Sequence, residues 1–243
     1  STKEVNLGTT YGTHTLRVAN TSTPSECSTT GFSQSACGFV LEFADIITTH
    51  NMNPRGTYNG TKYIVGWNKD GWPASSMYTF VNNDIYNALP NELKNAIIDT
   101  IVVSGHGSED TENFTSTDKL YLLSTAEVWA DAVSSSNSIN EINSNTTIFS
   151  LPSPEVGGDV IISLNHDSAR SVTRQLDYYK NLGTTSNNFS GAIKKNGTSA
   201  STWWLRSAFS NSSDSFYIVS YTGNCFSGNA DTTYGVSPAF RLE

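Results

Sequence analysis

The chain carries little charge. Only 15% of its 243 residues are Asp, Glu, Lys or Arg, against roughly a quarter in typical soluble proteins. The surface must therefore be polar mainly through Ser, Thr and Asn, a composition that is common in secreted and cell-surface proteins. The formal net charge is -8, and the 14 basic residues are scattered without a cluster. Nucleic acid and anionic membrane surfaces are excluded as partners, because both would be repelled.

Long apolar runs are also missing. No stretch approaches the roughly 18 apolar residues of a membrane span, and no charged segment followed by an apolar one opens the chain. The sequence predicts no direct membrane insertion, and we expect a soluble ectodomain that is secreted or held at a cell surface. The numbering begins at Ser1, which leaves open that a leader or an anchor was removed. Nothing resembles a linker, so a single domain over residues 1–243 is expected.

Cysteine is scarce, with only Cys27, Cys37 and Cys225. Zinc binding is disfavoured because no Cys-x-x-Cys or His-x-x-x-His spacing accompanies them. Cys27 and Cys37 flank a short loop rich in Ser, Thr and Gly, which predicts a local disulfide in an oxidising compartment. The alternative is two unpaired, half-buried thiols. Cys225 is expected to be free.

One segment lacks five residue types altogether. Residues 208 to 234 contain no Lys, Glu, Gln, Met or Trp, although all five occur elsewhere in the chain. What is left mixes rigid aromatic side chains with short polar ones, as in antibody-type binding surfaces. The alternative is a strand-loop-strand unit whose aromatic side chains alternate into a core. The predicted ligand-binding residues are Phe209, Asn211, Asp214, Phe216, Ile218, Tyr221, Asn224, Phe226, Asn229, Asp231 and Tyr234.

Alternating apolar residues predict a strand over residues 14–19, and a more buried strand over 38–47. A helix is predicted from Pro73 to Ala88, with Ser75 or Ser76 as its cap. A second helix after Pro90 is expected to turn Leu93, Ala96, Ile97 and Ile101 inward, because they follow the helical period.

Residues 120–123 predict a short strand, and Ser124 with Glu127 forms a capping box that begins a third helix. Residues 133–147 are almost all small and polar, which is typical of a surface loop. A last helix passes through Val172, Leu176 and Tyr179 and ends at Gly183. This order predicts an α+β fold, with helices packed on small antiparallel sheets and the N- and C-terminal strands paired around Leu16 and Phe240.

Six motifs occur in a fixed order along the chain. They are Trp72-Pro73-Ala74-Ser75-Ser76-Met77, Phe80-Val81-Asn82, Tyr86-Asn87-Ala88-Leu89-Pro90, Asp118-Lys119-Leu120-Tyr121-Leu122-Leu123-Ser124, Trp203-Trp204-Leu205-Arg206-Ser207 and Gly235-Val236-Ser237-Pro238-Ala239-Phe240. Together these motifs resemble a bacterial domain family of unknown function that is common in secreted and surface proteins of Gram-positive gut bacteria. The resemblance covers residues 38 to 243.

The resemblance implies a C-type-lectin-like fold, related to the formylglycine-generating enzyme and to the variable proteins of diversity-generating retroelements. In those variable proteins the C-terminal segment is the hypermutated ligand-binding face. Mutation of the adenines in an Asn codon never yields Lys, Glu, Gln, Met or Trp, the five types missing from residues 208 to 234. The resemblance therefore implies a recognition or adhesion domain whose ligand is a protein or a glycan on another cell or on a phage.

An enzyme is the alternative. A hydrolase would use His106, which lies in a run with Ser104, Ser108 and carboxylates, but a solvated turn explains this run more simply. A formylglycine-generating-type oxidase needs paired cysteines, whereas only Cys225 lies near the C-terminal end. No catalytic residue and no cofactor is therefore predicted. A structural calcium ion held by loop Asp and Asn oxygens is left open, with its ligands unknown.

Overall fold

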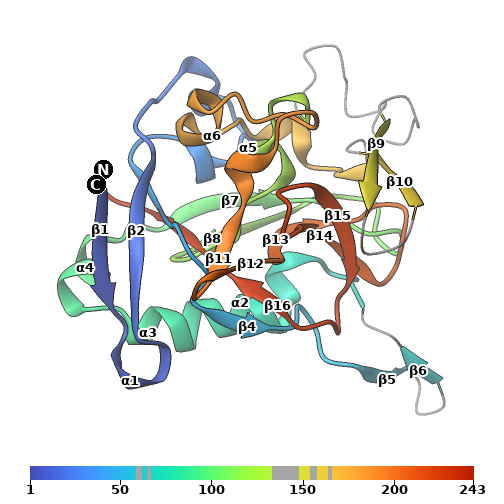
Figure 1. The fold of residues 1–243 in the computed structure, drawn as a ribbon, viewed down its shortest axis with the longest axis horizontal. Helices are drawn as coiled ribbons and strands as arrows, with labels where there is room; N and C mark the ends of the chain where they lie inside the picture. The colour runs from blue at the N-terminus through green and yellow to red at the C-terminus, as the bar shows by residue number, and fades with distance from the viewer. Residues whose placement is uncertain (59–61, 65–66, 133–147, 154–157, 164–165) are drawn as a thin grey trace.

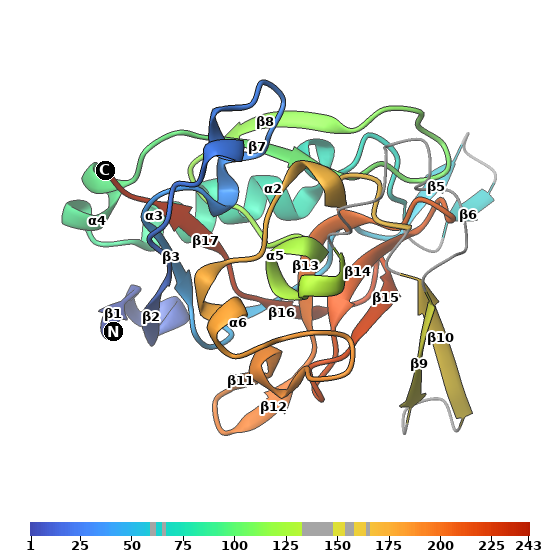
Figure 2. The ribbon, with the colours of Figure 1, turned by 90° about the horizontal axis from the view of Figure 1, so that it is seen from above.

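The computed structural model describes residues 1–58, 62–64, 67–132, 148–153, 158–163 and 166–243. Figure 1 shows a mixture of short helices and small sheets, most of whose strands are antiparallel. This arrangement agrees with the predicted α+β class. Both ends of the chain lie on the same side of the molecule (Figures 1 and 2).

A four-stranded antiparallel sheet contains the N-terminal strands. Its order is β1 (Thr2–Asn6), β2 (Thr13–Asn20), β3 (Val40–Phe43) and β17 (Ala239–Arg241). The strand predicted at 14–19 is β2, whereas the one predicted at 38–47 ends at Phe43. Direct pairing of the N- and C-terminal strands is wrong, because β3 lies between β2 and β17. The loop after β2 returns the chain alongside it, so that β17 can pair only with the far edge of β3.

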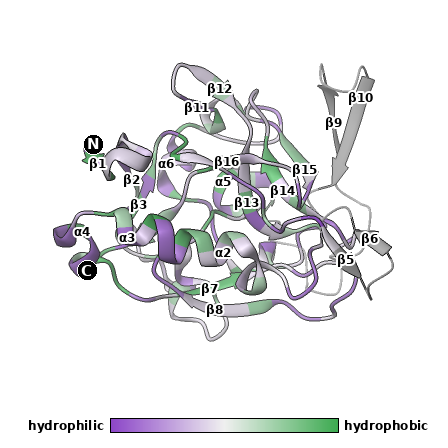
Figure 3. Cartoon of the chain, turned by 90° about the horizontal axis from the view of Figure 1, so that it is seen from below, coloured by the Kyte–Doolittle hydropathy of each residue, from purple (hydrophilic) through white to green (hydrophobic). Residues whose placement is uncertain are grey.

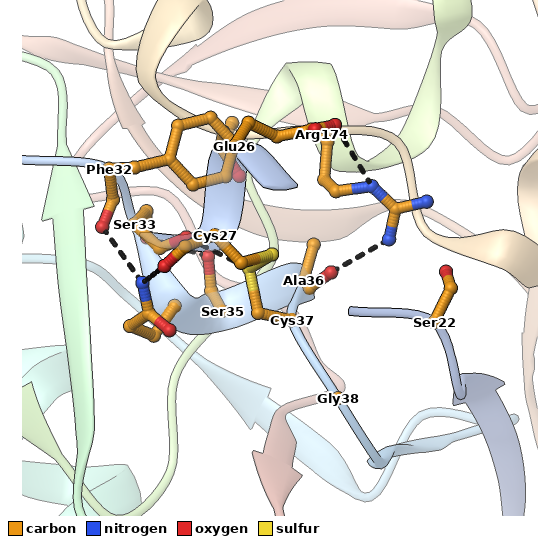
Figure 4. Close-up of a disulfide and its surroundings, with 12 residues drawn as sticks. Ser22, Glu26, Cys27, Phe32, Ser33, Ser35, Ala36, Cys37, Gly38 and Arg174 are labelled. Atoms are coloured by element: carbon orange, nitrogen blue, oxygen red, sulfur yellow. Dashed lines mark hydrogen bonds and ion pairs between the residues drawn. A yellow bond between two sulfur atoms is a disulfide. The ribbon is translucent and has the colours of Figure 1, made fainter. Parts of the chain in front are cut away.

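The disulfide between Cys27 and Cys37 is present in that returning loop, as predicted. Figure 4 shows the Arg174 guanidinium beside the bridge, where Nη1 donates to Ala36 O at 2.9 Å. Gln34 fixes the loop from within, because its Nε2 donates to Cys27 O at 2.9 Å. The disulfide therefore closes the loop on itself, and Arg174 ties the loop to the segment before α6 (Asp177–Asn181).

A five-stranded sheet occupies the centre of the molecule. Residues of β13 and β14 are buried along the whole length of both strands. Trp203 pairs with Gly235 in a parallel register, and the other pairings are antiparallel. The order of the strands is β15 (Cys225–Asn229), β14 (Ser215–Val219), β13 (Trp203–Ala208), β16 (Tyr234–Val236) and β4 (Thr48–His50).

The helix predicted from Pro73 to Ala88 is confirmed as one helical run from Ser76 onward. The run comprises α2 (Ser76–Phe80), a π-helical stretch at Val81–Ile85 and α3 (Tyr86–Ala88), and the extended Ser75 separates it from a 3-10 turn at Trp72–Ala74. Ser75 caps α2, because its Oγ accepts a hydrogen bond from the Tyr78 backbone N–H at 3.0 Å.

The second predicted helix is shorter than its apolar pattern indicated. α4 spans Asn91–Ala96, and Ala96 is exposed rather than inward. Ile97 is buried, but Ile101 is 51% exposed in β7 (Thr100–Ser104), which pairs with β8 (Phe114–Asp118). The β-branched run from Ile97 favours extended backbone over helix, which explains the error. Figure 3 shows hydrophilic α4 and hydrophobic β7.

The capping box at Ser124 and Glu127 is confirmed at the start of α5 (Thr125–Val128). The strand predicted over residues 120–123 is reduced to one bridge between Tyr121 and Ala239. The last predicted helix is α6, preceded by a 3-10 turn at Arg170–Val172 and followed by Gly183, which has a positive φ of 63°. The loop predicted at 133–147 lies outside the described residues.

The other elements are short. Within the described part of the chain, no helix is long and apolar enough to cross a membrane. The remaining elements are α1 (Gly8–Tyr11), the hairpins β5–β6 (Gly56–Tyr58, Lys62–Ile64), β9–β10 (Ile148–Ser153, Gly158–Ser163) and β11–β12 (Lys194–Asn196, Ser199–Ser201), and 3-10 turns at Ser25–Ser28, Gln34–Ala36, Ala130–Ala132 and Ser190–Ala192.

Candidate functional site

The segment from 208 to 234 combines buried strands with solvent-facing connections. Residues 209–214 join β13 to β14, 220–224 join β14 to β15, and 230–233 join β15 to β16. Of the predicted ligand-binding residues, Asn211 and Asn229 are exposed, and a further set is half-buried. The half-buried members are Phe209, Asp214, Tyr221, Phe226, Asp231 and Tyr234.

Three of the predicted contact residues are corrected by the structure. Phe216 is fully buried, and Ile218 and Asn224 are each 4% exposed, so their side chains are not presented to solvent. Phe216 and Ile218 lie two residues apart on β14 and therefore point to the same face of the sheet. For these two side chains the alternative interpretation, alternation into a core, is the right one.

A buried ion pair joins β13 to α5. The Arg206 guanidinium contacts Glu127 through Nη2 and Oε1 at 2.7 Å, and neither side chain is exposed. Glu127 also accepts hydrogen bonds from the hydroxyls of Ser35 and Thr173. Burial raises the pKa of Glu127, but the Arg206 charge and the hydrogen bonds from Arg206, Ser35 and the Ser124 backbone together outweigh it and hold this pKa below its usual value. A fully bonded pair of this kind fixes the position of β13 against α5.

The two tryptophans that begin β13 each donate a hydrogen bond to a distant part of the chain. Trp203 Nε1 donates to Ala192 O at 3.1 Å, and the Lys194 ammonium lies 4.2 Å from the centre of its ring. Trp204 Nε1 donates to His50 O at 2.9 Å. Both side chains are 0% exposed, so they form a buried frame for the C-terminal segment.

A second buried ionic group joins the four-stranded sheet to β11. Glu42 on β3 accepts from Arg17 at 2.9 Å and from Lys194 at 2.8 Å. Burial raises the pKa of Glu42, but the two cations outweigh it and hold this pKa below its usual value. Burial lowers the pKa of Lys194 to about 8, against the opposing effect of the Glu42 charge. Lys194 Nζ also donates to Ser237 Oγ at 2.9 Å, which connects the group to the chain just before β17.

Asn68 anchors the connection between β13 and β14. Its buried side chain donates through Nδ2 to Ser212 O and Ser215 O, each at 2.9 Å. Its backbone N–H donates to Ser213 O at 2.9 Å. Sequence reasoning gave Asn68 no role, because its partners lie far along the chain. The signal was an Asn beside a Trp in an otherwise polar loop.

The exposed side chains separate into two groups at opposite ends of β14. At the Ser215 end, Ala230 N–H donates to Asp214 O at 2.7 Å, which brings Asn229 and Asp231 beside the 209–214 connection. The Phe209 ring lies there against the ring of His166, with centroids 4.9 Å apart.

At the Val219 end of β14 there is a groove of about 330 Å³ between β16, β4, the β11–β12 hairpin and the turn after β14. Tyr221 and Tyr234 were predicted as ligand contacts and line it. Sequence reasoning missed its other walls, most of which come from parts of the chain before the 208 to 234 segment. These further residues are Thr49, Asn196, Ala200, Ser201, Thr202, Thr233 and Gly235.

The residues considered for catalysis do not form a reactive centre. Cys225 is fully buried, and burial raises the pKa of its thiol well above the usual value, which makes it a poor nucleophile. The His106 backbone N–H donates to Ser168 Oγ at 2.7 Å, and its ring Nδ1 lies 2.7 Å from Gly107 O. Neither partner is a carboxylate, so the arrangement differs from a triad.

A metal site is not evident in the part of the chain that the structure describes. Those residues contain no group of three or more His, Cys, Asp or Glu side chains that could hold an ion. In the Trp67–Asp70 run, Asn68 is engaged with the 209–215 backbone as above. The Asp70 backbone N–H donates to Asp110 Oδ2 at 2.8 Å. The calcium ion considered from the sequence thus keeps no assigned ligands.

Comparison with known proteins places the chain in a family. Residues 45–243 match the family described as "Domain of unknown function (DUF6273)", and the chain therefore belongs to that family. No curated protein and no solved structure was found to match it. The match begins just after β3 and includes the whole candidate site. It agrees with the resemblance to a family of unknown function, which was expected from residue 38 onward.

Proposed function

We propose that this chain is an extracellular recognition or adhesion domain, and that the connections of the 208 to 234 segment form its ligand-binding surface. One observation carries the proposal: half-buried aromatic side chains and exposed Asn residues lie in the connections and on β15 and β16, beside two strands that are buried throughout. Aromatic anchors held on a rigid frame give contact area at low entropic cost, and short polar neighbours adapt their hydrogen bonds.

We also propose a C-type-lectin-like fold related to the formylglycine-generating enzyme and to retroelement variable proteins. The α+β arrangement, the frame of Trp203, Trp204 and Phe240, and the missing residue types in 208 to 234 support this kinship. The ligand is then a protein or a glycan on another cell or on a phage, and the chain is secreted or displayed at a cell surface. Sequencing the gene's locus tests the retroelement origin: a reverse transcriptase gene and a template copy of these codons, differing at adenines, are expected.

The binding surface is tested on an array of surface glycans and proteins. The test variant combines Asn211→Ala, Tyr221→Ala and Phe226→Ala, which leaves the buried Phe216 and Ile218 untouched. Truncating a good aromatic anchor typically costs about 2 kcal/mol of binding or more, so a large loss of signal is expected.

A matched control replaces Glu92 and Asn95 on α4, two exposed residues outside the segment, with Ala. This control should bind like the wild type. Equal binding by the wild type and the folded triple variant, checked by circular dichroism, would place the ligand surface elsewhere.

A further inference from the structure

The groove at the Val219 end of β14 combines walls from four parts of the chain. Thr49 comes from β4, Ser201 from β12, Tyr221 from the turn after β14, and Tyr234 from β16. Figures 1 and 2 both place the β11–β12 hairpin next to the β16 end of the central sheet. The volume of the groove, about 330 Å³, falls at the lower end of the range of roughly 300 to 1,000 Å³ that is typical of small-ligand sites.

The lining has one chemical character. Every residue that lines the groove is uncharged, although the chain as a whole carries a formal net charge of -8. Two phenol rings supply flat apolar faces. Around them stand the hydroxyls of Thr49, Ser201, Thr202 and Thr233 and the side-chain amide of Asn196, which both donate and accept hydrogen bonds.

The Tyr234 ring and the backbone turn that carries Tyr221 are both held in place by their surroundings. Tyr234 packs edge-on against Trp204 with ring centroids 5.0 Å apart, and Trp204 is itself fully buried. In the turn that carries Tyr221, Ser220 N–H donates to Asn224 O at 2.8 Å. Gly223 completes this turn with φ at 93°, and a Cβ there would lie 2.1 Å from Phe189 O. The turn therefore has little freedom to move, which lowers the entropic cost of binding.

This lining discriminates among ligand classes. A charged group would lose its hydration without meeting an opposite charge, which is costly. A purely apolar ligand would cover the hydroxyls without bonding them. A neutral saccharide suits both features, because its C–H faces can stack on phenol rings while its hydroxyls bond to Thr, Ser and Asn.

We infer that the Tyr221 and Tyr234 groove binds a neutral saccharide unit of the ligand. This inference rests on the proposed recognition function and narrows it to one ligand class and one end of β14. The Ser215 end, with Asp214, Asn229 and Asp231, plays no part in this contact.

The test is an amide NMR titration of the whole chain with lactose, maltotriose, cellotriose and N,N′-diacetylchitobiose, with 3′-sialyllactose as an acidic comparison. At least one neutral probe should shift the amide signals of Thr202, Tyr221 and Gly235. Tyr221→Ala should weaken that binding at least tenfold, and Thr233→Val, which removes a rim hydroxyl and keeps the side-chain shape, should weaken it less. Glu92→Ala, on α4 and outside the 208 to 234 segment, should leave it unchanged.

Several results would overturn the inference: no binding by any neutral probe, shifts confined to other residues, or a Tyr221→Ala variant that remains folded and binds as well as wild type. If the array finds a protein ligand that depends on Asn211 or Phe226 while no saccharide binds, the saccharide inference fails and the recognition function stands. If neither experiment detects a ligand of the 208 to 234 segment, both fail.

Discussion

The strands and the connections of the C-terminal segment follow opposite rules. β13 and β14 are buried at every position, whereas the connections beside them carry exposed side chains such as Asn211 and Thr233. The strands are supported by the Arg206 and Glu127 pair, and the first connection is held through its backbone by Asn68. The buried residues that stabilise the sheet are thereby different from the residues that expose their side chains. Substitutions should therefore cost much in the strands and little in the connections.

The largest loss of stability is expected from Arg206→Ala. It leaves the fully buried Glu127 carboxylate without its cation, which typically costs about 3 to 5 kcal/mol. Urea unfolding of wild type and variant measures the difference. The control is Arg55→Ala, since Arg55 is 61% exposed and its pairing with Asp231 should contribute at most about 1 kcal/mol. Similar costs for the two variants would contradict the contrast between strand and connection.

A smaller loss is expected from Asn68→Ala. The change removes two buried hydrogen bonds, to the carbonyls of Ser212 and Ser215, which keep only the Ser108 and Phe209 amides as donors; the expected cost is about 1 to 3 kcal/mol for the two. Hydrogen exchange should quicken at the Phe209 and Ser212 amides, whose bonds lie within the same connection. The matched substitution Asn211→Ala, at an exposed Asn, should change neither quantity. Unaltered exchange in Asn68→Ala would mean that other contacts hold this connection.

Acid should destabilise the protein through three carboxylates. Glu42 and Glu127 have pKa values held below the usual 4.5 by their buried cations. Burial raises the pKa of Asp177, but hydrogen bonds from Thr21, Ser22 and Arg174 outweigh this and lower it from 3.8 to about 2.

At these three groups the unfolded chain then binds more protons than the folded chain in acid, so their contribution to the free energy of unfolding should be level above about pH 5 and fall below it. The contribution of Asp177 is present above its unfolded value and disappears as the pH drops from 3.8 towards 2. Urea titrations between pH 7 and 3 measure the curve. Asp177→Asn should flatten its most acidic part only slightly, because this side chain is partly exposed and solvent screens it. A curve that stays level to pH 3 would show that the three carboxylates contribute nothing.

The smallest change in stability is expected from Tyr221→Ala. This side chain lies in a connection and is half-buried, so its loss should move the free energy of unfolding by no more than about 0.5 kcal/mol. The same variant is the one expected to weaken saccharide binding most. A thermal melt alongside the NMR titration separates the two effects. A large stability loss would make Tyr221 part of the strand interior rather than of the binding surface.

Local signals in the sequence predicted local structure well. The Ser75 cap, the capping box at Ser124 and the disulfide of Cys27 and Cys37 each depend on residues close together in the chain, and each is present. The end of α4 was wrong, because Ile97 and Ile101 fit a helical period but are β-branched and continue as a strand. Periodicity alone did not decide between the two conformations.

The candidate site was predicted only in part. Composition identified the segment, but it could not separate buried Phe216 from half-buried Phe226, because that choice depends on which strands cover each face. Tyr234 was found, whereas Thr49 and Ser201 were not, since they approach it only after β4 and β12 have packed. Asn68 was missed for the same reason: its partners lie more than 140 positions further along the chain.

The position of β3 determines how far the N-terminus of a recombinant fragment can be truncated. The family match starts at residue 45, yet Glu42 on β3 neutralises the buried Lys194, and β17 hydrogen-bonds to β3 over Val40 to Glu42. A recombinant fragment that starts at residue 45 would leave an ammonium group buried without its carboxylate, and a strand edge open to other chains. The smallest unit to express or to graft onto another protein therefore begins at Val40 or earlier, ahead of the boundary that sequence similarity suggests.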